Sequence, residues 1–215
     1  REAAEAQLLT VAQRFLAGLP RDMEDFRRGS YARLVEDFDL DNFGSRGDRY
    51  LLDGMGVLAG PPDFEERGGR LVEEYQELHA GSWWRSEGLL HQRVVSYAEL
   101  DLVMDLVPPG GRKRLEGHRY QQNGYQGARS SEEWIMATSL PFNSNVDRSL
   151  CSENQLLSAV CGELAAAAAG DPRAALAETR GWLRLFVTGA PCLSCVGAMR
   201  QFQLLLPATT LQVSI

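Results

Sequence analysis

Residues 182–215 read "WLRLFVTGAPCLSCVGAMRQFQLLLPATTLQVSI", and this stretch contains the pattern that decides the fold. The apolar run 182–190 is typical of a buried strand, and it leads directly into Pro191. Apolar residues then recur at helical spacing over 192–206, and residues 209–215 alternate as a final strand does. A strand, a helix and a strand joined by short connections indicate parallel pairing, and therefore an α/β layer architecture.

The same alternation of elements extends upstream from this stretch. Residues 149–170 have the composition of a helix that ends at Gly170. Residues 133–142 are rich in strand-forming residues, and 93–107 predicts a strand, or a strand after a short helix. The second half of the chain, residues 94–215, therefore predicts one α/β domain.

The first half of the chain, residues 1–93, has a different pattern. Apolar residues at helical spacing predict helices over 2–18, 22–40 and 70–84. The segment 41–69 is rich in Gly, Asp and Pro and predicts a loop. We therefore expect a mainly helical N-terminal region before the α/β domain.

Composition limits the classes of protein to which the chain can belong. Of 215 residues, 44% are hydrophobic and 24% charged, as in a folded globular protein, and no apolar run is long enough for a membrane span. The formal net charge of −7 comes entirely from residues 1–99, because residues 100–215 have equal numbers of acidic and basic side chains. This acidic excess argues against binding of nucleic acid by the first half, while the second half permits it. The first residue is Arg1, and we expect the chain to be part of a larger parent protein.

Three of the four cysteines stand at the beginning of a predicted helix. Cys192 and Cys195 open the helix 192–206, and Cys151 lies near the start of the helix 149–170. The N-terminus of a helix stabilises a thiolate, which lowers the pKa of the thiol. Three thiolates brought together would bind Zn²⁺ and leave its fourth position open, which is the arrangement of a catalytic zinc site.

Glu153 supplies a carboxylate two residues after Cys151. It heads a helical stripe that continues through Leu157, Val160 and Leu164, so we expect the carboxylate to be partly desolvated and its pKa raised. Such a group can take a proton from zinc-bound water and return it to a substrate nitrogen.

Other interpretations of the cysteines remain possible at this point. A lone Cys-x-x-Cys also occurs in structural zinc knuckles, in redox pairs and as two core thiols. The fourth cysteine, Cys161, is expected to pack in the core, because its position along the helix turns it away from Cys151.

The combination Cys-x-Glu at 151–153 and Pro-Cys-x-x-Cys at 191–195 resembles the zinc-dependent cytidine/deoxycytidylate deaminase superfamily over roughly residues 95–215. The resemblance implies a three-layer α/β fold with a mixed central sheet and helices on both faces. It implies that Cys151, Cys192 and Cys195 bind about one Zn²⁺ per chain, with Glu153 as the proton shuttle. The reaction implied is attack of zinc hydroxide on C4 of cytosine with loss of ammonia, a hydrolysis of an amidine C–N bond.

Substrate contacts are implied less directly. "NVD" at 145–147 resembles the Asn-Val-Glu with which the cytidine-deaminase branch holds ribose, so Asn145 and Asp147 are candidates. Asn143 joins them, although Asn143 and Asn145 could equally cap the turn before the helix. Thr188 and Ala190 line the strand end where such folds open their pocket, so we expect backbone contacts between these residues and the base. The chain departs from this branch in two ways: Asn145 lies only six residues before Cys151, and Val196 stands where an arginine often follows the cysteine pair.

Three functions remain open from the sequence. The first is deamination of cytosine in DNA or RNA, as in editing deaminases and secreted toxins, with nucleic acid as the partner. The second is deamination of free cytidine or deoxycytidine. The third is an interaction module that zinc stabilises, with an inactive site, which the intact Glu153 disfavours.

Overall fold

The computed structural model describes residues 2–79, 94–105, 111–124, 134–141, 144–168 and 170–215. The helices are α1 (Glu2–Ala17), α2 (Met23–Arg27), α3 (Ser30–Phe38), α4 (Gly44–Gly54), α5 (Pro62–His79), the 3₁₀ helix η2 (Arg148–Leu150), α6 (Ser152–Ala167), α7 (Pro172–Glu178) and α8 (Leu193–Leu205). The strands are β1 (Leu58–Ala59), β2 (Val95–Asp105), β3 (Arg112–Gln122), β4 (Arg180–Val187) and β5 (Thr209–Ser214).

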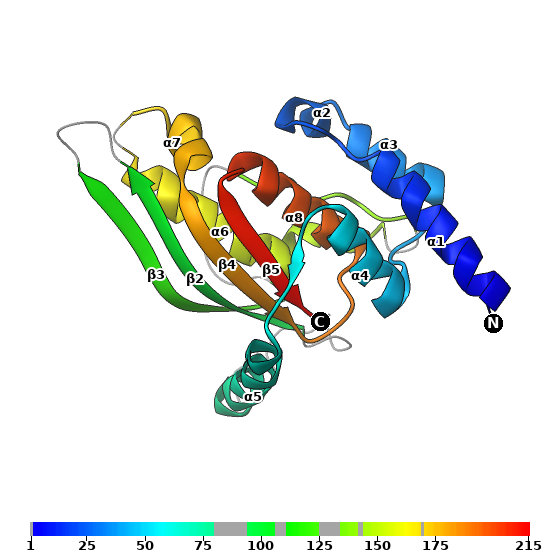
Figure 1. Cartoon of the computed structure of the whole chain (residues 1–215), viewed down its shortest axis with the longest axis horizontal. Helices are drawn as coiled ribbons and strands as arrows, with labels where there is room; N and C mark the ends of the chain where they lie inside the picture. Colours follow the sequence, from blue (N-terminus) through cyan, green and yellow to red (C-terminus); the bar gives the residue numbers. More distant parts are fainter. Residues whose placement is uncertain (1, 80–93, 106–110, 125–133, 142–143, 169) are drawn as a thin grey trace.

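Five strands form one open mixed sheet in the order β1-β5-β4-β2-β3 (Figure 1). The strands β4 and β5, which α8 connects, pair in parallel, as the pattern of residues 182–215 predicts. The strand β2 is antiparallel to both of its neighbours, β3 and β4. The prediction of an α/β fold with a mixed central sheet is therefore confirmed.

Helices pack on both faces of this sheet. Along β2, Ala98, Leu100 and Leu102 contribute to the core formed with α6 and α8, while Tyr97 points to the other face. On that second face Phe64 and Val72 of α5 pack against Tyr97 in a smaller apolar cluster. Figure 1 shows α5 on one side of the sheet and α6, α7 and α8 on the other.

The N-terminal helices and the α/β part share one hydrophobic core. Phe15, Tyr31 and Val35 belong to the same buried cluster as Met199 and Phe202 of α8. The strand β1, which lies between α4 and α5 in the sequence, pairs in parallel with β5 at the edge of the sheet. The first part of the chain therefore contributes directly to the structure around the second.

One strand prediction is wrong. Over its described part, residues 134–141, the segment 133–142 forms no strand, although its composition favours one. Side chains of α8 satisfy its backbone instead: the amide of Gln201 accepts from Met136 N (2.9 Å) and donates to Met136 O (2.8 Å). In addition, Thr138 N donates to the hydroxyl of Ser194 (3.0 Å). Side chains of α8 therefore provide the backbone hydrogen bonds that a neighbouring strand would otherwise provide.

Three other boundaries differ from the prediction. The helix expected over 22–40 is divided into α2 and α3 at Gly29, whose positive φ of 74° interrupts the helical backbone. The loop expected over 41–69 contains α4 and the beginning of α5, which starts at Pro62, a residue well suited to a first helical turn. The strand β3 begins at Arg112, in a segment for which no element was expected.

Candidate metal centre

Three cysteine sulfurs converge between the beginnings of α6 and α8. The Sγ atoms of Cys151, Cys192 and Cys195 all lie within 4.8 Å of one another, and those of Cys192 and Cys195 are 3.5 Å apart. All three cysteines are free thiols, and Cys195 is buried while the other two are half-buried. Residues 41 positions apart in the sequence therefore form one cluster.

The helix beginnings explain this convergence. Cys151 and Cys192 are the N-cap residues of α6 and α8, with extended backbone angles of φ −63°, ψ 138° and φ −71°, ψ 162°. The carbonyl of each cysteine already accepts the first helical hydrogen bond, from Gln155 N and Val196 N respectively, both at 3.0 Å. Each cysteine side chain therefore projects from a helix end whose backbone N–H groups favour a thiolate.

The closeness of the three thiols shifts their pKa values. Hydrogen bonds from the thiols of Cys192 and Cys195 lower the pKa of Cys151 to about 4. The same interactions raise the pKa of Cys192 to about 11 and raise that of Cys195, because each donates its proton to Cys151. A bound cation would take the place of these protons.

The donor set and its spacing fit zinc. Ligands placed tetrahedrally at about 2.3 Å from a zinc ion, the usual Zn–S distance, lie about 3.8 Å apart. The separations in the cluster, 3.5 Å for one pair and below 4.8 Å for all, lie close to this value. Thiolate ligands favour zinc over hard cations such as Mg²⁺. The three cysteines can therefore bind a metal ion, and no fourth Cys, His, Asp or Glu joins the cluster among the residues that the structure describes.

Glu153 is the buried carboxyl group beside the cysteines. Its exposed fraction is only 4%, and Ser152 Oγ donates a hydrogen bond to its Oε2 (2.9 Å). Ser96 Oγ on β2 lies 2.8 Å from Ser152 Oγ, so a chain of two hydroxyls extends from the sheet to the carboxyl group. Burial raises the pKa of Glu153, and the nearby charge of Cys192 raises it further. A carboxyl group with a raised pKa is suited to both accepting and donating a proton.

Backbone atoms of the N-terminal region hold the beginning of α8. Leu193 N, which follows the N-cap cysteine, donates to the carbonyl of Asp41 (2.7 Å), and Leu193 O accepts from the hydroxyl of Tyr31 (2.5 Å). The buried carboxyl group of Asp48 accepts from Phe43 N (3.0 Å) in the same segment. The position of Cys192 is therefore fixed partly by residues outside the α/β part.

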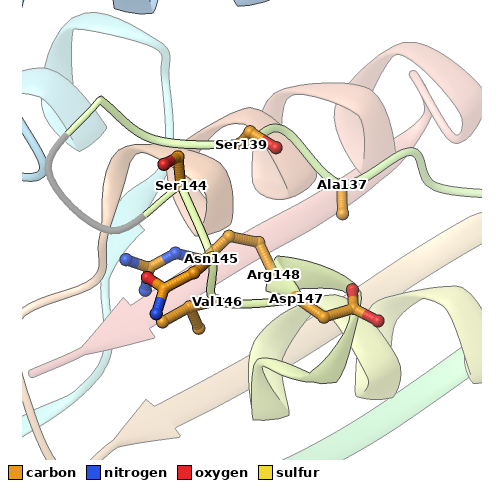
Figure 2. A pocket seen from close by; sticks show the side chains of 7 residues that line it. All are labelled: Ala137, Ser139, Ser144, Asn145, Val146, Asp147 and Arg148. Atoms are coloured by element: carbon orange, nitrogen blue, oxygen red, sulfur yellow. The ribbon is translucent and has the colours of Figure 1, made fainter.

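A pocket of about 350 Å³ lies beside the beginning of α6. Figure 2 shows the residues that line it: Ala137, Ser139, Ser144, Asn145, Val146, Asp147 and Arg148. Two of the predicted substrate contacts, Asn145 and Asp147, therefore line the same pocket, and both are exposed. Asp147 also caps η2, because its Oδ1 accepts from Ser149 N (3.0 Å). Asp147 therefore both caps η2 and lines the pocket.

The remaining predicted residues have different positions. Thr188 and Ala190 are exposed after β4; the hydroxyl of Thr188 accepts from Val95 N (3.4 Å), and neither residue is among those that line the pocket. Asn143 lies outside the described residues. Cys161 is fully buried in the main core and takes no part in the cysteine cluster, as expected.

Sequence reasoning missed three residues around the site. Ser152 stands between the cysteine and the glutamate of Cys-x-Glu, so its position in that motif could have suggested a contact with Glu153. Ser96 and Arg148 carry no such signal, because only the packing of β2 and η2 brings them to the site.

Comparison with protein-family models gives no match, and neither a search of curated proteins nor one of solved structures finds a similar protein. The interpretation of this site therefore depends on its own geometry. Among the described residues, no helix combines the length and the apolar character that crossing a membrane requires.

Proposed function

We propose that the protein is a zinc-dependent hydrolytic deaminase that converts cytosine to uracil in DNA or RNA. The observation that carries the proposal is the convergence of Cys151, Cys192 and Cys195 with the buried carboxyl group of Glu153 beside them. A structural zinc site is normally closed by four protein ligands. Three thiols and an adjacent proton-transfer group instead suit hydrolysis.

The described residues would have separate roles in this reaction. A zinc ion bound by the three thiolates would supply the activated water that attacks C4 of cytosine. The carboxylate of Glu153 would accept one proton from this water and deliver it to the ring nitrogen N3. It would then pass the second proton, from the hydroxyl group added at C4, to the amino group, which leaves as ammonia. Ser152 would orient the carboxyl group through its hydrogen bond to Oε2. The low exposure of Glu153 would keep bulk water from competing for the proton.

The order of elements gives independent support. The strands β4 and β5 are parallel, α8 connects them, and α6 and α8 cover the same face of the sheet, so the beginnings of both helices meet. This arrangement is consistent with the layered fold that the resemblance to the deaminase superfamily implies. The cysteines of the two sequence motifs lie at those two helix beginnings.

The alternative substrate is free cytidine or deoxycytidine. Asn145 and Asp147 favour it, because both line the pocket and can bond ribose hydroxyls. Their exposure favours nucleic acid, since a pocket that opens to solvent admits a base extruded from a longer strand.

One assay tests both substrates. Zinc-loaded protein is incubated with cytidine, deoxycytidine, single-stranded DNA, duplex DNA and RNA, and uracil is quantified by mass spectrometry. We expect uracil in a polynucleotide. Glu153→Gln should lower kcat about 10²- to 10⁴-fold while the protein retains its zinc. Uracil from the nucleosides only would select the alternative, and undiminished activity of Glu153→Gln would refute the proposed role of the carboxyl group.

A further inference from the structure

The pocket beside the metal centre contains one arginine, Arg148, among its lining residues. Its side chain is only 13% exposed, so most of the side chain is shielded from water. The Nε atom is buried and has no hydrogen-bond partner among the residues that the structure describes. A buried guanidinium usually bonds a carboxylate or a phosphate through several N–H groups. Arg148 therefore lines the pocket with a guanidinium whose hydrogen-bond donors are not all used.

The carboxylates of Asp41 and Asp147 leave this capacity largely unused. Asp41 Oδ2 lies 3.8 Å from Nη2 of Arg148, which is an ion pair but too long for a hydrogen bond. Asp147 lines the same pocket, but its Oδ1 accepts from the backbone N–H (3.0 Å) and from the hydroxyl (2.5 Å) of Ser149. In Figure 2 its carboxylate and the guanidinium of Arg148 point in opposite directions. A ligand anion could approach Arg148 without meeting Asp147 first.

The neutral groups of the pocket complement an anion. Ser139 and Ser144 provide hydroxyl donors, and Asn145 provides an amide whose side chain lies next to the guanidinium in Figure 2. Phosphate oxygens accept hydrogen bonds from all of these groups. A volume of about 350 Å³ is larger than a phosphate alone requires, so a phosphate could enter together with the sugar that carries it.

The pocket adjoins the metal centre through the backbone. Arg148 belongs to η2, and its carbonyl accepts from Cys151 N (3.1 Å), the backbone of one of the three metal-binding candidates. The backbone of Arg148 is therefore one turn of chain away from Cys151.

We propose that Arg148, with the hydroxyls of Ser139 and Ser144, binds a phosphate of the substrate that carries the target cytosine. The phosphate is either the 5′-phosphate of a mononucleotide or a phosphodiester of a polynucleotide. This inference rests on the proposed function and names the chemical class of its substrate as phosphorylated rather than as a free nucleoside.

The test compares substrates that differ only in phosphate. For zinc-loaded wild-type protein, kcat/KM is measured with deoxycytidine, deoxycytidine 5′-monophosphate and a trinucleotide with a central deoxycytidine. The variants are Arg148→Gln, Arg148→Lys, which keeps the charge, and Arg173→Gln, which removes an exposed arginine of α7 as the control. Isothermal titration with uridine, uridine 5′-monophosphate and inorganic phosphate measures binding without turnover.

We expect a phosphate to raise kcat/KM, and Arg148→Gln to lower it about 10- to 100-fold more for a phosphorylated substrate than for deoxycytidine. Arg148→Lys should lie between wild type and Arg148→Gln, and Arg173→Gln should match wild type. A loss confined to the monophosphate identifies the terminal phosphate, and a loss confined to the trinucleotide identifies a phosphodiester.

Two results separate the failure of this inference from that of the function. If Arg148→Gln lowers kcat/KM equally for all three substrates, and uridine 5′-monophosphate binds no more tightly than uridine, the phosphate site is refuted while deamination stands. If no cytosine is deaminated but uridine 5′-monophosphate binds through Arg148, the proposed reaction is refuted and the phosphate site is supported.

Discussion

The N-terminal helices and the α/β part of the chain contribute to the candidate site in different ways. The α/β part supplies the chemical groups, namely three thiols and a carboxyl group. The N-terminal region supplies support, and at the beginning of α8 it does so through the carbonyl of Asp41 and the hydroxyl of Tyr31. Metal-binding groups require particular residue types at fixed spacing, whereas a backbone carbonyl is available in any residue. The metal-binding residues are therefore visible as a motif in the sequence, whereas the residues that support the beginning of α8 are not.

The largest expected effect concerns the metal and compares two cysteines of the α/β part. Wild-type protein should contain about one zinc ion per chain by atomic emission, and Cys192→Ala should lose it together with all activity, because two thiolates remain. Cys161→Ala removes a thiol that is fully buried in the core and should retain the zinc. Zinc retained by Cys192→Ala, or lost from Cys161→Ala, would show that the cluster is not the metal site.

The next prediction concerns the contribution of the N-terminal helices to stability. Phe15 on α1 is fully buried and packs edge-on against Phe38 and Phe43, with ring centroids 5.2 and 5.5 Å apart. Phe15→Ala should lower the free energy of unfolding by about 3 to 5 kcal/mol, measured by urea denaturation. Leu9→Ala, a change of an exposed residue on the same helix, should cost well under half as much.

The same unfolding curves also show whether the N-terminal helices and the α/β part unfold together. Because Phe15 shares its buried cluster with α8, fluorescence and circular dichroism should report one coincident transition that Phe15→Ala shifts as a whole. Two separate transitions, with only the first shifted by Phe15→Ala, would mean that the regions fold independently.

The smallest expected effect depends on pH and on a carboxyl group of the N-terminal region. Burial raises the pKa of Asp48 from its ordinary value of 3.8 to about 6, so the folded protein binds a proton that the unfolded chain releases. The wild-type protein should therefore lose about 2 to 3 kcal/mol of stability as pH rises from about 4 to above 6. Asp48→Asn, which cannot lose a proton, should lack this loss.

The pH dependence is measured as the difference between wild type and Asp48→Asn in urea denaturation from pH 4 to pH 8. Asp37→Asn, a change of an exposed carboxylate on α3, is the matched control and should keep the wild-type profile. A difference between wild type and Asp48→Asn that does not change with pH would contradict the raised pKa of Asp48.

The sequence predicted the elements whose residues repeat at a clear period. The strand β4, the helix α8 and the strand β5 follow from apolar runs and from prolines at their ends, and their parallel pairing follows from the short connections. The extended segment 134–141 shows the limit of such reasoning. Its composition suits a strand, but Gln201 and Ser194 bond its backbone, and no local pattern reports which neighbour a segment will meet.

The cysteines and Glu153 were recognisable from the sequence because a metal site and a proton-transfer group need rare residue types at spacings that helix geometry fixes. Only the tertiary structure determined that the three sulfurs lie within 4.8 Å of one another, that Ser96 extends the hydrogen bonds of Glu153, and that Arg148 faces a pocket. These relations join segments far apart in the chain, and their distances depend on how α6, α8 and the sheet pack together. Local residue preferences act over one or two turns of chain, so they cannot specify contacts that side-chain packing across the whole core decides.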